Sequence, residues 1–152
     1  MGYTHYFSHM ETTEEKWAAI LKDCEKLHES LPRDLLIAGS QGEGWPIFND
    51  SAIIFNGQAI DDHDHETFAM YQEGIERQKW HDPDRMPFTC CKTARKPYDL
   101  MVCACLLAYK HHSPDTMALG SDGEADDWLS AENFVHSALG YRVSFDKMKY
   151  KA

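Results

Sequence analysis

The sequence lacks any long hydrophobic run. Its longest uncharged apolar segment, Leu100 to Tyr109, has about ten residues, whereas a helix that spans a bilayer needs about 20. The N-terminal stretch also lacks the positive start and apolar middle of a secretory signal peptide. We therefore expect a protein with no membrane-spanning segment and no secretion signal.

Several short motifs of catalysis and binding are also missing. There is no Gly-x-Ser-x-Gly, and the glycine-rich stretch Gly39 to Gly44 lacks the Lys-Ser/Thr ending of a phosphate-binding loop and the spacing of a dinucleotide fingerprint. The five cysteines, which show no Cys-x-x-Cys spacing, are Cys24, Cys90, Cys91, Cys103 and Cys105. Their odd number and spacing argue against a disulfide framework or a zinc knuckle, so we interpret them as core residues in a reducing compartment.

Positive charge is scarce. The chain has 15 Lys and Arg against 25 Asp and Glu, a formal net charge of −10. General nucleic-acid binding depends on clustered cations that release counterions, and this composition argues against it. The few cations are nevertheless grouped, with Lys92, Arg95 and Lys96 inside five residues.

The chain has the size and composition of one globular domain. At 152 residues it is shorter than the roughly 250 beyond which chains divide, and 43% of its residues are hydrophobic. Period-two patterns and apolar runs predict strands near 2–9, 35–38, 52–55, 67–70, 88–91, 116–119 and, at an edge, 141–145. Helical periodicity predicts helices near 13–31, from Pro97 through Tyr109, and 126–139. A capping box that starts at Thr12 marks the first of them.

This order of elements predicts an α+β fold. We expect residues 1–152 to form a single domain with a mixed or mainly antiparallel sheet of five to six strands, packed with three helices. The segment 100–109 carries no charge, so the helix that contains it should be central and buried. Trp45 on its glycine-rich loop could stack on a flat ligand, but we expect it to pack back onto the core.

The start of this central helix is a candidate anion site. Pro97 suits a first helical turn, and Lys92, Arg95 and Lys96 precede the unpaired amides of the helix N-terminus. Arg offers bidentate contacts to a phosphate, and Lys offers a point charge. The alternative is that these cations form a solvated loop that pairs with surface carboxylates.

Candidate ligand-binding residues extend beyond the three cations. Groups that could hydrogen-bond or stack on a phosphorylated, nucleotide-like ligand lie in several separate segments. The predicted set is Lys92, Thr93, Arg95, Lys96, Tyr98, His5, Tyr6, Asn56 and Asp122. Tyr3 could take part as well.

Two histidine-containing stretches and one cysteine allow other interpretations. In the run Asp61 to Glu66, an extended backbone would aim His63 and His65 the same way, a weak metal signal that a polar surface loop explains better. His111 and His112 suit the negative end of the central helix. Cys91 beside Lys92 could have a lowered pKa, although core packing is the default.

Nearly the whole chain resembles a family of small uncharacterised proteins encoded by tailed bacteriophages. The resemblance lies in residues 1–6 (MGYTHY), 55–57 (FNG), 66–68 (ETF), 91–99 (CKTARKPYD) and 121–123 (SDG), with Trp128. It implies a phage origin and location in the cytoplasm of an infected bacterium, and it implies no particular reaction. Small phage proteins often counter host defence, and by that analogy this one would sequester a nucleotide signal.

Three functional hypotheses follow. The first is a non-catalytic anti-defence protein that sequesters a phosphorylated nucleotide signal, with no cofactor and no metal. The second is a metal-assisted phosphoesterase that uses Asp61, His63 and His65 as metal ligands, with Lys92 and Arg95 on the phosphate. The third is an acidic inhibitor that binds a host protein. The sequence does not predict the oligomeric state, and it is compatible with a homo-oligomer.

Overall fold

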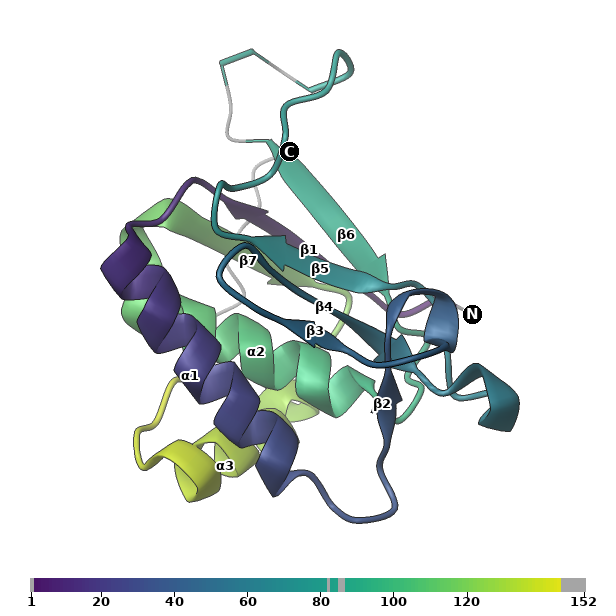
Figure 1. Ribbon diagram of the computed structural model, residues 1–152. Helices are drawn as coiled ribbons and strands as arrows, with labels where there is room; N and C mark the ends of the chain where they lie inside the picture. The colour runs from purple at the N-terminus through teal and green to yellow at the C-terminus, as the bar shows by residue number, and fades with distance from the viewer. Residues whose placement is uncertain (1, 82, 85–86, 146–152) are drawn as a thin grey trace.

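The computed structural model describes residues 2–81, 83–84 and 87–145. Within these residues the chain forms three α-helices, α1 (Glu14–Ser30), α2 (Asp99–His112) and α3 (Ala125–Leu139). The strands are β1 (Thr4–His9), β2 (Ile37–Ala38), β3 (Ile47–Phe48), β4 (Ala52–Gly57), β5 (Phe68–Tyr71), β6 (Phe88–Lys92) and β7 (Met117–Ser121). This is the predicted α+β domain, with seven strands where five to six were expected (Figure 1).

The strands form two antiparallel sheets. The first has the order β6-β1-β7, and in the second β4 pairs with β2, β3 and β5. The sheets are connected where Glu66, just before β5, meets the end of β6. The Glu66 amide donates to the Lys92 carbonyl at 3.1 Å, and the Lys92 amide donates to Glu66 Oε1 at 2.7 Å. This junction holds the start of β5 against the end of β6.

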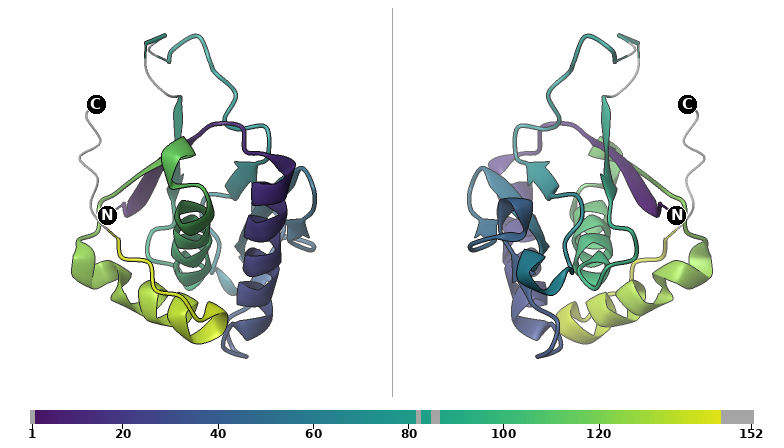
Figure 2. Two further views of the ribbon diagram at one scale, coloured as in Figure 1. Left: turned by 90° about the vertical axis from the view of Figure 1, so that its left-hand side faces the viewer. Right: turned by 90° about the vertical axis from the view of Figure 1, so that its right-hand side faces the viewer.

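Helix α2 is the buried central helix that its uncharged sequence predicts. Every residue from Met101 to Tyr109 is buried. Figure 2 shows the helix surrounded by the strands, α1 and α3. An α-helix without a polar face is stable in water only if neighbours cover it on all sides, and here two helices and a sheet do so.

Strand β1 faces this helix with four aromatic rings. Side chains alternate along a strand, so Tyr3, His5, Phe7 and His9 lie on one face. Phe7 contacts Phe68 of β5, with ring centroids 5.5 Å apart, and His9 contacts Tyr109 of α2 at 5.1 Å. The predicted alternation of β1 is therefore confirmed, and it directs two histidines toward the core.

The sequence predictions were wrong in five details. Residues 141–145 form no strand, whereas β3 was not predicted. The N-cap of α1 is Thr13, whose hydroxyl accepts from the Lys16 amide, while Thr12 is buried one residue earlier. Helix α2 begins at Asp99, after Pro97. Trp45 is 89% exposed, so it does not pack on the core.

The lengths and hydropathy of the helices were compared with those of membrane-spanning helices. None of those in the described part of the chain is both long and apolar enough to cross a bilayer.

Candidate functional site

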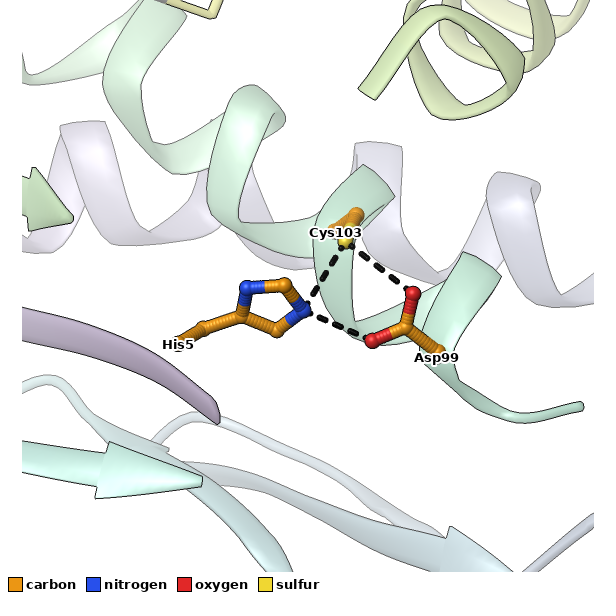
Figure 3. Close-up of side chains that lie close together, drawn as sticks. All are labelled: His5, Asp99 and Cys103. Carbon is orange, nitrogen blue, oxygen red and sulfur yellow. Dashed lines mark hydrogen bonds and ion pairs between the residues drawn. The ribbon is translucent and has the colours of Figure 1, made fainter. Parts of the chain in front are cut away.

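A buried cluster of three different polar side chains lies where β1 meets the first turns of α2. We call His5, Asp99 and Cys103 the His5 cluster (Figure 3). His5 Nε2 lies 2.7 Å from Asp99 Oδ1 and 3.3 Å from Cys103 Sγ, and Cys103 Sγ lies 3.7 Å from Asp99 Oδ2. Asp99 and Cys103 are four residues apart on α2, so they share one helix face, and β1 presents His5 to that face.

Neighbouring segments hold the cluster in place. The other ring nitrogen of His5, Nδ1, lies 2.8 Å from Ser121 Oγ at the end of β7, and the Gly123 amide donates to the same oxygen at 2.9 Å. Thr93 Oγ1 donates to Asp99 Oδ1 at 2.6 Å. Residues from β1, β7, α2 and the 93–98 loop thus form one hydrogen-bonded network around the imidazole.

Burial and mutual interaction set the protonation states. Burial by itself raises the pKa of Asp99, but hydrogen bonds from His5, Thr93 and Cys103 and the charge of His5 outweigh it, so the pKa is lowered. For Cys103, burial and the Asp99 carboxylate hold the pKa well above its ordinary value. The cluster therefore contains a carboxylate and a protonated thiol at neutral pH.

Tyr3 and Arg95 cover the cluster on its outer side. The Arg95 guanidinium lies 3.9 Å from the centre of the Tyr3 ring, and its Nη1 lies 3.3 Å from Asp127 Oδ1 at the start of α3. Burial, followed by the nearby carboxylate of Asp99, raises the pKa of Tyr3 to about 12. Tyr3 is almost fully covered, whereas the Arg95 side chain is 62% exposed and presents its charge to solvent.

The three predicted cations lie on one tight turn, residues 92–96, which we call the cationic turn. Ala94 and Arg95 both have left-handed backbone angles, with φ of 51° and 58°. Non-glycine residues rarely adopt this region, and it costs on the order of 1 kcal/mol each. The amides of Thr93 and Ala94 both donate to the Tyr3 carbonyl, and these bonds fix the turn against β1.

The lysines of the cationic turn also have neighbours. Lys96 Nζ donates to the Asp62 carbonyl at 2.8 Å and lies 3.6 Å from its carboxylate. The Lys92 side chain lies along the backbone of Gly2, so closely that a Cβ on Gly2 would stand 2.4 Å from Lys92 Cε. The exposed pairs Arg95–Asp127 and Lys96–Asp62 match the alternative in which these cations pair with surface carboxylates.

The structure brings some predicted ligand residues together and separates others. His5 and Thr93 meet at Asp99. Tyr6 and Asp122 meet as well, since the Tyr6 hydroxyl donates to Asp122 Oδ1 at 3.3 Å, and the Thr4 amide binds the other oxygen. Tyr6 lies on the opposite face of β1 from His5, so the strand separates the Tyr6–Asp122 pair from the His5 cluster.

Asn56 and Tyr98 have structural contacts instead. The Asn56 amide side chain binds the backbone of His65 through both its oxygen and its nitrogen, and it shapes the 58–66 loop. The Tyr98 hydroxyl donates to the Glu66 carbonyl at 2.6 Å, at the junction of the two sheets. Both side chains are fully buried, so they lie beneath the candidate surface.

The other histidine and cysteine stretches are organised differently from the His5 cluster. Among the described residues, Asp61, His63 and His65 do not form a group of three ligand atoms that could share a metal ion. His112 Nε2 lies 2.6 Å from Asp23 of α1, and His111 stacks on Tyr141, which ties the end of α2 to its neighbours. Burial raises the pKa of Cys91 to about 12, so the lowering of this pKa that its neighbour Lys92 could have caused is not found.

One cavity was not predicted from the sequence. A cavity of about 590 Å³ lies between β5 and β6 under the 72–81 segment. Its aromatic lining comes from Phe7, Tyr71, Trp80, His81 and Phe88. Trp80, a large aromatic in an otherwise polar segment, was the sequence signal that could have indicated a pocket.

Comparison of the chain with protein-family models, with curated proteins and with solved structures produced no match. The function is therefore inferred from the geometry of the site.

Proposed function

We propose that this protein binds a small phosphorylated ligand, with the phosphate at the cationic turn, and holds it without turnover. The observation that carries this proposal is the grouping of Lys92, Arg95 and Lys96 on one strained turn beside a hydrogen-bonded histidine. Strained non-glycine residues cluster at ligand sites, where the surrounding structure holds them in place.

Arg95 is the residue best suited to the phosphate. Its guanidinium is mostly exposed, and its partner Asp127 accepts one bond at 3.3 Å in a solvent-exposed pair. Exposed pairs of this kind contribute only about 0–1 kcal/mol, whereas a bidentate contact between Arg and a phosphate is about twice as strong as a neutral hydrogen bond. A phosphate can therefore displace Asp127 at little cost, while the Tyr3 ring keeps the guanidinium in position.

A nucleotide also needs an aromatic surface for its base. Tyr3 and His5 are buried, so they cannot stack on a ligand. Trp80 is 65% exposed and lines the cavity beside β6, together with Phe88 at the start of that strand. From Phe88 to Lys92 the strand advances by four residues, or about 13 Å, so the cavity and the cationic turn lie at opposite ends of β6. We therefore place the base in the cavity and the phosphate at the turn.

Binding is favoured over catalysis by the state of the nearest nucleophile. The thiolate form of cysteine is the reactive one, and the raised pKa of Cys103 keeps this residue a thiol. His5 Nε2, which would have to remove its proton, is already engaged by Asp99 at 2.7 Å. A nucleophilic mechanism at the His5 cluster would thus start from an unreactive pair.

The biological role in this proposal follows from the resemblance to tailed-phage proteins. A phage protein that holds a nucleotide in the bacterial cytoplasm can lower the free concentration of a defence signal. The ligand class is accordingly a phosphorylated nucleotide signal of the host, and the protein acts as an anti-defence sponge.

Isothermal titration with a panel of signalling nucleotides tests the proposal. We expect one nucleotide class to bind. Arg95→Ala should lower the affinity for it about 10-fold or more, because a hydrogen bond to a charged group contributes about 1.5–3 kcal/mol. Lys26→Ala, which removes an exposed cation from α1, is the matched control and should bind as the wild type does. Trp80→Ala should lower the affinity for the nucleotide but leave the affinity for inorganic phosphate unchanged.

Two results would contradict the proposal. If no nucleotide in the panel binds, the sponge function is wrong. If a nucleotide binds but is recovered hydrolysed after the complex is denatured, the protein is an enzyme, and the phosphoesterase hypothesis replaces the sponge.

A further inference from the structure

We propose that His5, Asp99 and Cys103 form a zinc-type metal centre with three protein ligands and one open coordination position. The inference is independent of the proposed function. Among the described residues, this is the group of His, Cys, Asp and Glu in which three ligand atoms lie within 4.8 Å of one another. A nitrogen, an oxygen and a sulfur ligand form a set that suits Zn²⁺.

The separations of the ligand atoms fit a tetrahedral ion. Bonds of about 2.0–2.1 Å to nitrogen and oxygen and about 2.3 Å to sulfur place ligand atoms about 3.3–3.6 Å apart. Cys103 Sγ lies 3.3 Å from His5 Nε2 and 3.7 Å from Asp99 Oδ2. We assign Asp99 Oδ2 as the oxygen ligand, because Oδ1 already accepts from Thr93 at 2.6 Å.

The groups behind the ligands have the arrangement that metal sites require. A ligating histidine uses one nitrogen for the metal, and the other is held by a hydrogen bond that fixes the ring. Ser121 Oγ takes this position on Nδ1 of His5, and the Gly123 amide in turn holds the serine oxygen. Thr93 Oγ1 holds Asp99 in a similar way, because it donates a hydrogen bond to Oδ1. Nε2 and Oδ2 are thus oriented toward Cys103 (Figure 3).

Access to the centre comes from one side. His5 is fully buried and Cys103 nearly so, whereas the Asp99 side chain is 21% exposed. The fourth ligand, a water molecule or an anionic oxygen, therefore approaches past Asp99, on the side of the cationic turn. Three protein ligands with one open position are the arrangement of zinc sites that act on a bound molecule, whereas structural sites are closed by four.

Metal binding replaces protons at the cluster. The thiol proton of Cys103 leaves to solvent as the sulfur–metal bond forms. The hydrogen between His5 Nε2 and Asp99 Oδ1 also leaves to solvent, and His5 binds the ion as the neutral imidazole that carries its hydrogen on Nδ1, toward Ser121 Oγ. The affinity for the ion should therefore rise with pH, since the ligands must be deprotonated. The resulting thiolate, imidazole and carboxylate carry a charge of −2, which neutralises a divalent ion in a buried position.

Titration of the reduced protein with Co²⁺ tests the inference. The absorption spectrum of bound Co²⁺ depends on its ligands. We expect the near-ultraviolet charge-transfer band of a thiolate ligand together with the visible bands of tetrahedral cobalt. Zn²⁺ should then displace Co²⁺ and remove both. Cys103→Ala should abolish the charge-transfer band. Cys105→Ala, which removes a buried thiol two residues along α2, and Cys90→Ala, which removes the exposed one, should retain it.

A second variant distinguishes the loss of a metal ligand from the loss of the fold. Asp99→Asn keeps the size of the side chain, and we expect it to weaken Zn²⁺ binding about 10-fold or more, with the thiolate band still present at saturation. Circular dichroism checks the fold of each variant. The inference is overturned if the folded wild-type protein shows no thiolate band with Co²⁺, or if the band persists in Cys103→Ala or disappears in Cys90→Ala.

Discussion

At the scale of single residues, two histidines on the same face of β1 have opposite environments. Both ring nitrogens of His5 have partners, whereas neither ring nitrogen of His9 has one, although His9 is buried. Burial lowers the pKa of His9 to about 4, an effect that the Met10 backbone only partly offsets. His9 is therefore neutral and acts as an aromatic core residue between Phe7 and Tyr109.

This difference makes the stability of the protein sensitive to acid. The unfolded chain binds a proton at His9 below about pH 6.5, but the folded chain binds it only below about pH 4, so stability falls as the pH falls through this interval. We expect a loss of about 2 kcal/mol in the free energy of unfolding between pH 7 and pH 5 from this residue. Urea unfolding at the two pH values measures it.

The control for this prediction is a matched substitution. His9→Phe should remove most of the loss, whereas His65→Phe, at an exposed position, should retain it. If His9→Phe loses stability as steeply as the wild type, another group is responsible.

At the scale of elements, α2 determines the packing of the domain. Its uncharged sequence predicts burial, and α1, α3 and the strands supply the surfaces that cover it. Its first turns also carry Asp99 and Cys103, so the helix that forms the core presents the His5 cluster at its beginning. Core packing and the candidate site are therefore coupled through one element.

We expect Leu106→Ala to lower the free energy of unfolding by about 2–5 kcal/mol, because it leaves a cavity at a fully buried position of α2. Leu129→Ala on α3 makes the same chemical change where the side chain is about half exposed, and it should cost less than about 1 kcal/mol. Urea denaturation at constant pH measures both. Equal losses would show that α2 is not the centre of the core.

At the scale of the whole molecule, the two sheets meet at a small polar junction. The backbone of Glu66 pairs with Lys92, and the Tyr98 hydroxyl donates to the Glu66 carbonyl. Sequence reasoning grouped Tyr98 with the ligand residues because it lies close to the cations in the chain. Its position in the structure indicates a role in holding β5 and β6 together.

Tyr98→Phe separates the two roles. We expect it to reduce the free energy of unfolding by about 1–2 kcal/mol, since it removes a short buried hydrogen bond to the Glu66 carbonyl, and to leave nucleotide affinity unchanged. Tyr71→Phe, at a residue of β5 that is 42% exposed, is the control for stability. If Tyr98→Phe instead lowers the affinity and spares the stability, the sequence interpretation is right.

The sequence by itself determined the α+β class, the buried central helix and the alternation of β1, because hydrophobic periodicity and uncharged runs are local properties of the chain. It also singled out the cationic turn, where three charges lie within five residues. Cys103 was identified only as a core residue. Nothing in a linear pattern indicates that residues 5, 99, 103 and 121 meet.

Only the tertiary structure decided those long-range contacts. The antiparallel pairing of β1 with β6 and β7 places His5 opposite Cys91 and Ser121, and the packing of α2 against that sheet brings Asp99 and Cys103 to its imidazole. Register and helix packing depend on how whole surfaces fit together, and this is why neither the cluster nor the cavity beside β6 follows from local sequence.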